Sequence, residues 1–160
     1  MTAPSAFRFG AIAREGGVLF QVWSQTSNIE LVLEHGPGPA LELRADGVRQ
    51  AFVPGLGGGA RYGYRIDGQG PFPDPASRSQ PEGVHGLSAV VDPQFAWTDA
   101  GFAPRPWSQT VFYELHCGTF TPDGTFAAAA ARLPALVELG VTAVELLPLA
   151  DAPGRRNWGY

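Results

Sequence analysis

The last residues of the sequence combine side chains that suit sugar binding. Residues 154–160 read GRRNWGY, so that an amide, Asn157, stands beside two aromatic rings, Trp158 and Tyr160. The apolar C–H groups of a pyranose ring pack on an aromatic face, while polar groups at the rim hydrogen-bond its hydroxyls. Rings in a loop of Gly, Asn and Arg also serve, and more often, as packing residues. The residues alone therefore leave both roles open for Trp158 and Tyr160.

Two glutamates and a histidine could support acid–base chemistry. Glu114 and Glu145 lie within two apolar stretches that we expect to form adjacent parallel strands, where their carboxylates could approach each other. Hydrolysis of a glycosidic bond needs two such groups. Because we place both glutamates mid-strand, we favour a structural role for them and predict no catalytic residue. His116 lies nearer the end of its strand, where it either positions the next loop or contacts a sugar.

Motifs for metal, cofactor or nucleophilic chemistry are missing. The three histidines, His35, His85 and His116, are scattered along the chain, and no Ser-His-Asp or phosphate-binding motif is present. The single cysteine, Cys117, has no partner for a disulfide or a zinc site. We therefore predict no metal and no cofactor, and we expect Cys117 to be a small buried thiol.

Composition and charge exclude several classes of partner. A chain of 160 residues that is 44% hydrophobic and 16% charged is typical of a globular protein. With a net charge of −4 and no run of Lys or Arg, we expect neither nucleic acid nor a membrane as a partner. The start, MTAPSAFRFG, lacks the features of a signal peptide, and no apolar run is long enough to span a membrane, so a cytoplasmic location is expected.

The first part of the sequence is typical of a β-sandwich. Ile29, Leu31 and Leu33 alternate with polar residues, as in strands with one buried face. Trp23 and Trp97 could be platforms for starch, but we expect Trp23 to be a core residue, because tryptophan among apolar strand residues is usually buried. For the sandwich as a whole we favour a domain-docking role over starch binding. The expected strands cover residues 17–24, 28–34, 39–45, 49–55 and 60–67.

The next segment, residues 68–99, is rich in proline and shows almost no periodicity. Loops of this length are usually functional or connect domains. We expect a boundary shortly after it, with a first domain over residues 1–105, including the proline-rich connection, and a second over residues 106–160.

The second part of the sequence predicts a βαβ unit. Apolar stretches at residues 110–118 and 141–149 flank an alanine-rich helical segment at residues 124–140. Thr125 can cap the helix, and Pro134 is expected to bend it or split it into two pieces. Such a crossover makes the two strands parallel.

The residues from Val111 to Tyr160, VFYELHCGTFTPDGTFAAAAARLPALVELGVTAVELLPLADAPGRRNWGY, resemble the first strand, helix and second strand of the catalytic barrel of the alpha-amylase superfamily of glycoside hydrolases. The preceding region resembles the isoamylase-type N-terminal module of debranching, branching and trehalose-forming enzymes. GPFPDPASRSQPEGVHGLSAVVDP, YELHCGTFTPDGTF and ADAPGRRNWGY are most similar to the members that release trehalose. One departure is Ser24-Gln25, where members usually have Ala-Pro.

The resemblance implies a fold and a function. The fold is an immunoglobulin-like β-sandwich followed by the first β-α-β of an incomplete (β/α)8 TIM barrel. The function is hydrolysis, with retention, of the α-1,4 bond next to the trehalose end of malto-oligosyltrehalose. Tyr160 matches a family tyrosine that stacks on the sugar beside the scissile bond, and Asn157 and Trp158 shape that loop. Family catalytic carboxylates lie on later strands, so this chain alone is expected to be inactive.

Two alternatives stay open beside this function. The chain could instead be a non-catalytic α-glucan-binding or interaction module, or part of an isoamylase-type debranching or branching enzyme. In each case the implied partner is a malto-oligosaccharide or α-glucan. A complete barrel needs about 250 residues, so the chain is expected to be truncated and a C-terminal barrel segment is a further expected partner.

Overall fold

The computed structural model describes residues 9–150, which form two compact units. The first unit extends to Phe95 and the second begins at Ala96. This division lies within residues 91–106, a stretch without helix or strand. The domain boundary expected after residue 105 falls in the same stretch and stays a prediction.

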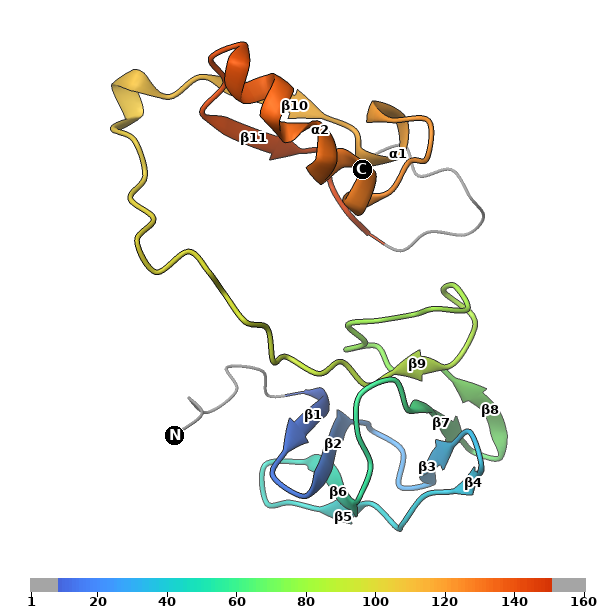
Figure 1. Cartoon of the computed structure of the whole chain (residues 1–160). Helices are drawn as coiled ribbons and strands as arrows, with labels where there is room; N and C mark the ends of the chain where they lie inside the picture. The colour runs from blue at the N-terminus through green and yellow to red at the C-terminus, as the bar shows by residue number, and fades with distance from the viewer. Residues whose placement is uncertain (1–8, 151–160) are drawn as a thin grey trace. The chain divides into compact units, whose positions relative to one another are not determined.

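The first unit consists of two antiparallel sheets (Figure 1). The first sheet contains, in spatial order, β1 (Gly10–Arg14), β2 (Gly17–Trp23), β6 (Val48–Pro54) and β5 (Glu42–Leu43). The second contains, in order, β4 (Gly36–Pro37), β3 (Ile29–Leu33), β7 (Arg61–Ile66) and β8 (Gln69–Phe72), and β9 (Ser88–Ala89) also pairs with β7.

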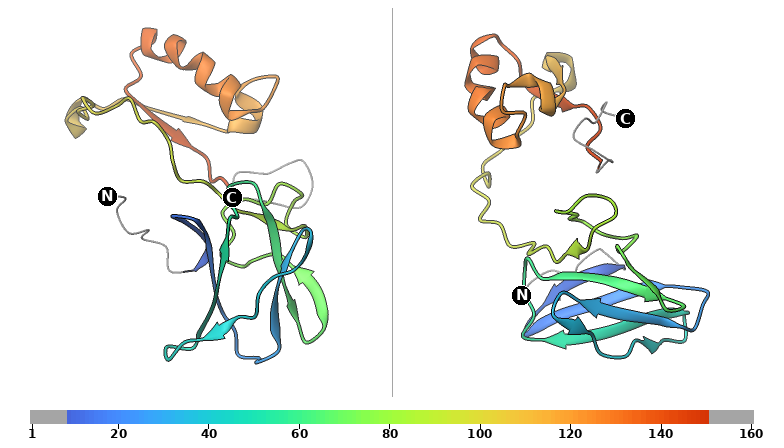
Figure 2. Two further views of the ribbon diagram at one scale, coloured as in Figure 1. Left: turned by 60° about the horizontal axis from the view of Figure 1, so that its bottom comes forward. Right: turned by 90° about the vertical axis from the view of Figure 1, so that its right-hand side faces the viewer.

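A single apolar core lies between these sheets, which face each other as Figure 2 shows. Phe20 of β2 and Tyr62 of β7 meet at its centre, with ring centroids 4.8 Å apart in an edge-to-face arrangement. Leu31 and Tyr64 are register partners on β3 and β7 and point into the same core. The alternation of apolar and polar residues in the sequence explains why these side chains point into the core, because every second residue of a strand lies on the same face.

All five strands expected in this region are present as β2, β3, β5, β6 and β7. Four further strands, β1, β4, β8 and β9, were not predicted. Residues 68–99 are therefore not one continuous loop, since β8 pairs with β7 at Tyr64 and Ile66, and β9 pairs with it at Arg61 and Tyr62. These strands are two to five residues long, too short for an alternating pattern to identify them.

The second unit is a βαβ arrangement, as the sequence predicts. Its two strands pair in parallel, with Phe112 opposite Ala143 and Leu115 opposite Leu146. The elements in chain order are the 3-10 helix η1 (Trp107–Gln109), β10 (Phe112–Leu115), α1 (Cys117–Phe120), α2 (Phe126–Glu138) and β11 (Ala143–Leu146). Cys117 begins α1 instead of extending the strand, and its thiol is buried as expected.

Local sequence signals set the limits of α2. The hydroxyl oxygen of Thr125 accepts a hydrogen bond from the amide of Ala128 at 3.2 Å, which confirms the predicted N-cap. Gly140, with φ of +93°, closes the C-terminal turn in a conformation that glycine tolerates best. Of the bend or split expected at Pro134, the split is wrong, because α2 is one continuous helix that includes this residue, and the bend stays a prediction.

Apolar side chains of the second unit remain largely exposed. Only Leu115, Cys117, Ala129 and Leu136 are buried among its described residues. Both strands and the helix expose large apolar side chains, namely Phe112, Tyr113, Phe126, Val137, Val144 and Leu146. Within residues 9–150, no helix combines the length and the apolar character needed to cross a membrane.

Candidate functional site

The carboxyl ends of β10 and β11 form the candidate site. Because the strands are parallel, Leu115 and Leu146 end them at the same edge of the sheet. Ligands of parallel sheets bind beyond this edge. The predicted binding residues Asn157, Trp158 and Tyr160 follow β11 along the chain, but they lie outside the described residues and stay predictions.

His116 is the one predicted binding residue that the structure describes, and it directly follows β10. Its backbone is extended, with φ −95° and ψ 111°, and its carbonyl accepts hydrogen bonds from the amides of Thr119 and Phe120 at 3.0 and 2.9 Å. The backbone of His116 therefore begins the turn of α1, while its half-buried imidazole belongs to the candidate edge. A sugar contact by this ring stays a prediction.

Two glycines keep the loop after β10 compact. A Cβ at Gly118 would lie 3.0 Å from Cε1 of His116, so the imidazole lies against this glycine. Gly124, with φ of +61°, approaches Gly118 so closely that a Cβ would lie 2.9 Å from its carbonyl oxygen. Side chains at either position would displace the loop or the ring.

Glu114 and Glu145 are register partners on the two strands. They lie closer to the strand ends than the sequence suggests, because β10 and β11 end only one residue later. Both side chains are exposed. Their register brings two carboxylates onto neighbouring strands near the candidate edge, while the structural role favoured for them stays a prediction.

The most strongly perturbed ionisable groups lie in the first unit. Asp74 is 3% exposed and its carboxylate accepts hydrogen bonds from the Tyr62 hydroxyl and the Ala76 amide, both at 2.8 Å. Its own amide donates to the hydroxyl of Ser88 at 3.0 Å. Burial raises the pKa of Asp74, and burial with the nearby Asp74 charge raises the pKa of Tyr62.

We call this arrangement the Asp74 clasp and define it by Tyr62, Asp74 and Ser88. It holds the proline-rich segment against β7. Its polar groups are hydrogen-bonded to other protein groups, so its role is structural. The sequence pattern alone did not predict it. The available signal is an aspartate between Pro73 and Pro75, where a short carboxylate folds back onto the amide two residues later.

Two tryptophans outside the candidate edge are exposed. Trp23 is 55% exposed at the end of β2, so the expectation of a core tryptophan is wrong. The cause is the alternation of β2, in which Val18, Phe20 and Val22 point into the core and Trp23 points away. Trp97, in the second unit, is 74% exposed.

Metal-ligating side chains do not gather in the part of the chain that the structure describes. No three His, Cys, Asp or Glu side chains of residues 9–150 lie close enough together to bind a metal ion.

The arrangement of strands places the chain beside known carbohydrate-active enzymes. No family model matches the sequence. A crystal structure of a candidate alpha amylase from Salmonella typhimurium superimposes with a TM-score of 0.88 at 39% identity, over 96% of this chain and 26% of that one. A pullulanase from group B Streptococcus, solved with maltotetraose, gives a TM-score of 0.68 at 25% identity over 89% of this chain and 24% of that one. The chain is thus similar to glycoside hydrolases of the alpha-amylase superfamily.

Curated relatives narrow this class. Malto-oligosyltrehalose trehalohydrolase of Deinococcus radiodurans is 44% identical over 156 residues, which are 96% of this chain and 26% of the relative. The enzyme of the same name from Saccharolobus solfataricus is 40% identical over 95% of this chain and 27% of its own length. The expected resemblance is confirmed: this chain is related to the N-terminal part of the malto-oligosyltrehalose trehalohydrolases, and it spans about a quarter of their length.

Proposed function

We propose that this chain forms the N-terminal part of a glycoside hydrolase that cleaves the α-1,4 bond next to the trehalose end of malto-oligosyltrehalose and releases trehalose. The observation that carries the proposal is the 44% identity to a malto-oligosyltrehalose trehalohydrolase over 156 residues. The substrate and activity belong to the whole enzyme. Alone, the chain is inactive.

The first unit serves as the isoamylase-type, immunoglobulin-like module of this enzyme. Two antiparallel sheets around one core support this assignment.

The second unit supplies the first strand, helix and second strand of a (β/α)8 barrel. Support comes from the parallel pairing of β10 and β11 across α2, which is the repeating unit of that fold. The exposed Phe112, Val144 and Leu146 are consistent with it, since strands of a closed barrel are covered on both faces. The apolar surface would then be buried by later strands and helices.

The edge beyond β10 and β11 forms one wall of the sugar site. His116 stands on the loop after β10, and Asn157, Trp158 and Tyr160 on the loop after β11, as active-site residues of such barrels do. Tyr160 stacks on the sugar ring next to the scissile bond, and Asn157 and Trp158 shape the loop that presents it.

The acid and the nucleophile come from parts of the enzyme beyond this chain. Retaining hydrolysis requires one carboxylate to attack the anomeric carbon and one carboxyl group, about 5 Å away, to protonate the leaving oxygen. Glu114 and Glu145 keep structural roles in this scheme. The substitution Glu114→Gln, which removes one of these charges, therefore lowers the stability of the complete enzyme more than it lowers the rate of the chemical step.

The proposal is tested by trehalose release. The 160-residue chain and a longer polypeptide that contains it with a complete barrel are each incubated with malto-oligosyltrehalose, and free trehalose is measured. We expect release by the longer polypeptide only. Trehalose release by the 160-residue chain would contradict the assignment of the carboxylates to later strands, and no release by the longer polypeptide would contradict the substrate.

A branching or debranching enzyme is the second candidate. A 1,4-alpha-glucan branching enzyme from Streptomyces coelicolor is 33% identical over 90% of this chain, and the pullulanase likeness points toward debranching. Incubation of the longer polypeptide with amylose and with amylopectin distinguishes a branching enzyme from a debranching enzyme. New branches in amylose would support the branching enzyme, and linear chains from amylopectin the debranching enzyme.

A further inference from the structure

The sheet of the first unit that contains β1, β2, β6 and β5 has an edge at β1. Among the described strands, β1 pairs with β2 alone, so its other side directs backbone groups away from the sheet. The backbone groups of successive residues in a strand point to opposite sides, so Phe9, Ala11 and Ala13 direct theirs to the same side. Backbone amides and carbonyls at a sheet edge are a template for the addition of another strand.

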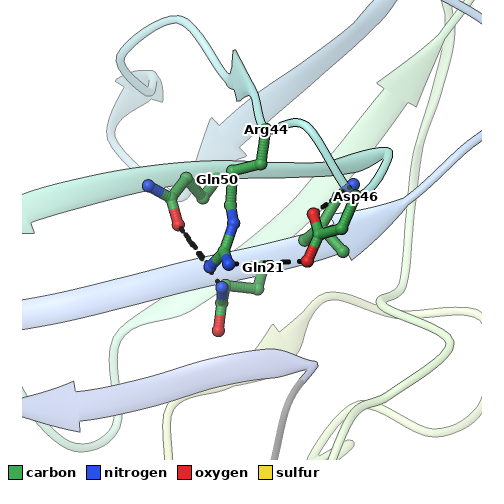
Figure 3. A network of polar contacts seen from close by, with 5 residues as sticks. Gln21, Arg44, Asp46 and Gln50 are labelled. Carbon is green, nitrogen blue, oxygen red and sulfur yellow. Dashed lines mark hydrogen bonds and ion pairs between the residues drawn. The ribbon is translucent and has the colours of Figure 1, made fainter.

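The other edge strands of this unit are protected by their length or their composition. β4 and β5 are two residues long, and β8 contains Pro71, which has no amide hydrogen to donate. Next to β5, Figure 3 shows the charged side chains of Arg44 and Asp46 close together, with nitrogen and oxygen 3.4 Å apart, and charges at an edge disfavour strand addition. β1 has five residues and no proline, so it depends on another form of protection.

Arg78 of the proline-rich segment supplies this protection. Its guanidinium donates one hydrogen bond to the carbonyl of Ala11 and another, at 3.4 Å, to the carbonyl of Phe9. These carbonyls belong to alternate residues, so both lie on the outer side of β1. The guanidinium holds several donors in one plane, which suits two acceptors that are one strand repeat apart. One side chain thus occupies two carbonyls that an added strand would use.

The segment around this arginine, residues 74–79, lies along the same edge, and we call it the strap. A Cβ at Gly10 would lie 2.9 Å from the carbonyl oxygen of Ala76, so the strap touches the start of β1. The backbone of Ala11 also hydrogen-bonds the hydroxyl of Tyr62, which is a member of the clasp described above. A strand that adds to the start of β1 would have to displace these groups.

Hydrogen bonds that do not involve the guanidinium hold the strap in place. The Ser77 amide donates to the Asp74 carbonyl at 2.9 Å, and the Ser77 hydroxyl donates to the Ser79 carbonyl at 2.9 Å. The Ser79 carbonyl also accepts from the Ala89 amide of β9 at 2.8 Å, which joins the strap to the second sheet. The strap is therefore anchored at both of its ends, so loss of the Arg78 side chain should leave the first unit folded.

The geometry of the edge fits a second copy of β1. Among residues 9–150, no hydrogen bond joins Ala13 to the strap, so part of the edge is already uncovered. With a two-fold axis at Ala11, two antiparallel copies of β1 place Ala13 of each copy opposite Phe9 of the other. All three residues direct their backbone groups to this side, so each pair can form its hydrogen bonds. The small side chains of Ala11 and Ala13 do not hinder the approach.

We propose that the edge of β1 is a strand-addition surface for a second copy of this chain, and that Arg78 keeps this surface closed in the monomer. Loss of the guanidinium frees the carbonyls of Phe9 and Ala11, and pairing with a second copy satisfies them again. The proposal is independent of the function proposed above, because all of these residues belong to the first unit.

The test compares the 160-residue wild type with variants by sedimentation velocity over a range of protein concentrations. We expect Arg78→Ala to dimerise with a dissociation constant lower than that of the wild type by about tenfold or more. Amide exchange at Ala13 should slow as the concentration of this variant rises. The matched control is Arg65→Ala, which removes an arginine paired with Glu30 on the second sheet and should sediment as the wild type does. Any association through the second unit is common to all of these chains, so it does not affect the comparison.

A second substitution distinguishes strand addition from a general loss of structure. Ala13→Pro removes an outward amide of β1, and proline is compatible with an edge strand. The double variant Arg78→Ala/Ala13→Pro should therefore sediment as the wild type does. If far-UV circular dichroism shows that Arg78→Ala does not fold, Arg78→Lys takes its place, because lysine keeps the charge but lacks the planar set of donors.

Four results would overturn the proposal. The first is equal sedimentation, at every concentration, of the wild type and the folded Arg78 variant. The second is a dimer that persists when Ala13→Pro is added, and the third is the same association in Arg65→Ala. The fourth is association without slower exchange at Ala13, which would place the contact elsewhere on the chain.

Discussion

Asp74 shows how one residue of the proline-rich segment fixes a part of the chain without regular structure. It is 3% exposed, and each of its carboxylate oxygens has a hydrogen-bond donor, one from Tyr62 and one from Ala76. Such satisfaction is what allows a carboxyl group to be buried. The clasp therefore orders the segment between β8 and β9, and through β9 it adds a pairing partner to β7.

Removal of the Asp74 side chain should destabilise the first unit. Asp74→Ala leaves the Tyr62 hydroxyl and the Ala76 amide without their acceptor inside the protein, which costs about 2–3 kcal/mol in the free energy of unfolding. Urea denaturation of the first unit measures the change. The matched control is Asp92→Ala, because Asp92 is exposed and accepts only a local bond from Gln94. Equal effects of the two substitutions would contradict a structural clasp.

The clasp also gives stability a defined dependence on pH. Burial raises the pKa of Asp74 in the folded chain above its ordinary value of about 3.8. The folded chain then binds this proton more tightly than the unfolded chain, so the stabilisation is complete below about pH 3.8 and is lost as the pH rises through the higher folded pKa. Asp74→Asn cannot titrate. The free energy of unfolding of the wild type, relative to Asp74→Asn, should therefore decrease as the pH rises, and a constant difference would exclude the effect.

At the scale of elements, α2 shows that local sequence signals set where a helix begins and ends, while tertiary context determines whether it continues through an unfavourable residue. Thr125 begins it and Gly140 follows its end, as the sequence predicts. Pro134 has no amide hydrogen to donate to Ala130, yet the helix continues through it to Glu138. The N-cap matters more in such a helix, because one internal hydrogen bond is already missing.

Loss of the cap should weaken α2 measurably. Thr125→Ala removes the acceptor of the Ala128 amide and costs about 1 kcal/mol of helix stability, whereas Thr125→Ser keeps the hydroxyl. Amide hydrogen exchange over the first turn of α2 measures both variants. We expect faster exchange in Thr125→Ala and nearly unchanged exchange in Thr125→Ser, and identical rates in the two variants would show that the hydroxyl does not cap the helix.

Across the whole molecule, the sequence predicts features that depend on neighbours along the chain. Alternation places Ile29, Leu31 and Tyr64 in the core because a strand repeats every two residues. The same periodicity, applied to β2, points Trp23 outward, and the expectation failed because it weighted hydrophobicity above period. The pairing of β8 and β9 with β7 depends on contacts distant in sequence, so no local pattern reveals it.

In the candidate site, too, some features follow from neighbours along the chain and others depend on contacts distant in sequence. His116 could be placed at the end of its strand from the apolar stretch before it, and the structure puts it there. The register that makes Glu114 and Glu145 neighbours follows from parallel pairing, but their closeness to the strand ends depends on where the ladder stops. The Asp74 clasp combines residues from three separate segments, which only the folded chain brings together.

The two units should differ in stability within the isolated chain, because among residues 9–150 only those of the first unit form a closed core. Phe20, Leu31, Tyr62 and Tyr64 are at most 2% exposed there, whereas Phe112 is 48% and Leu146 is 42% exposed in the second unit. A pair of strands with open apolar faces cannot exclude water from its hydrogen bonds. Amides of β2, β6 and β7 should therefore exchange with deuterium far more slowly than those of β10 and β11.

A matched measurement on the longer polypeptide with a complete barrel separates the causes of this difference. If later strands cover the apolar faces, as we propose, amide exchange at β10 and β11 is slower in the longer polypeptide than in the isolated chain, while exchange at β2 and β7 changes little. The reason is that closure of a barrel removes the open edges that a two-stranded sheet leaves. Equally slow exchange of both units in the 160-residue chain would mean that the βαβ unit is stable without a barrel, and fast exchange of β10 in the longer polypeptide would mean that its apolar face is not covered there.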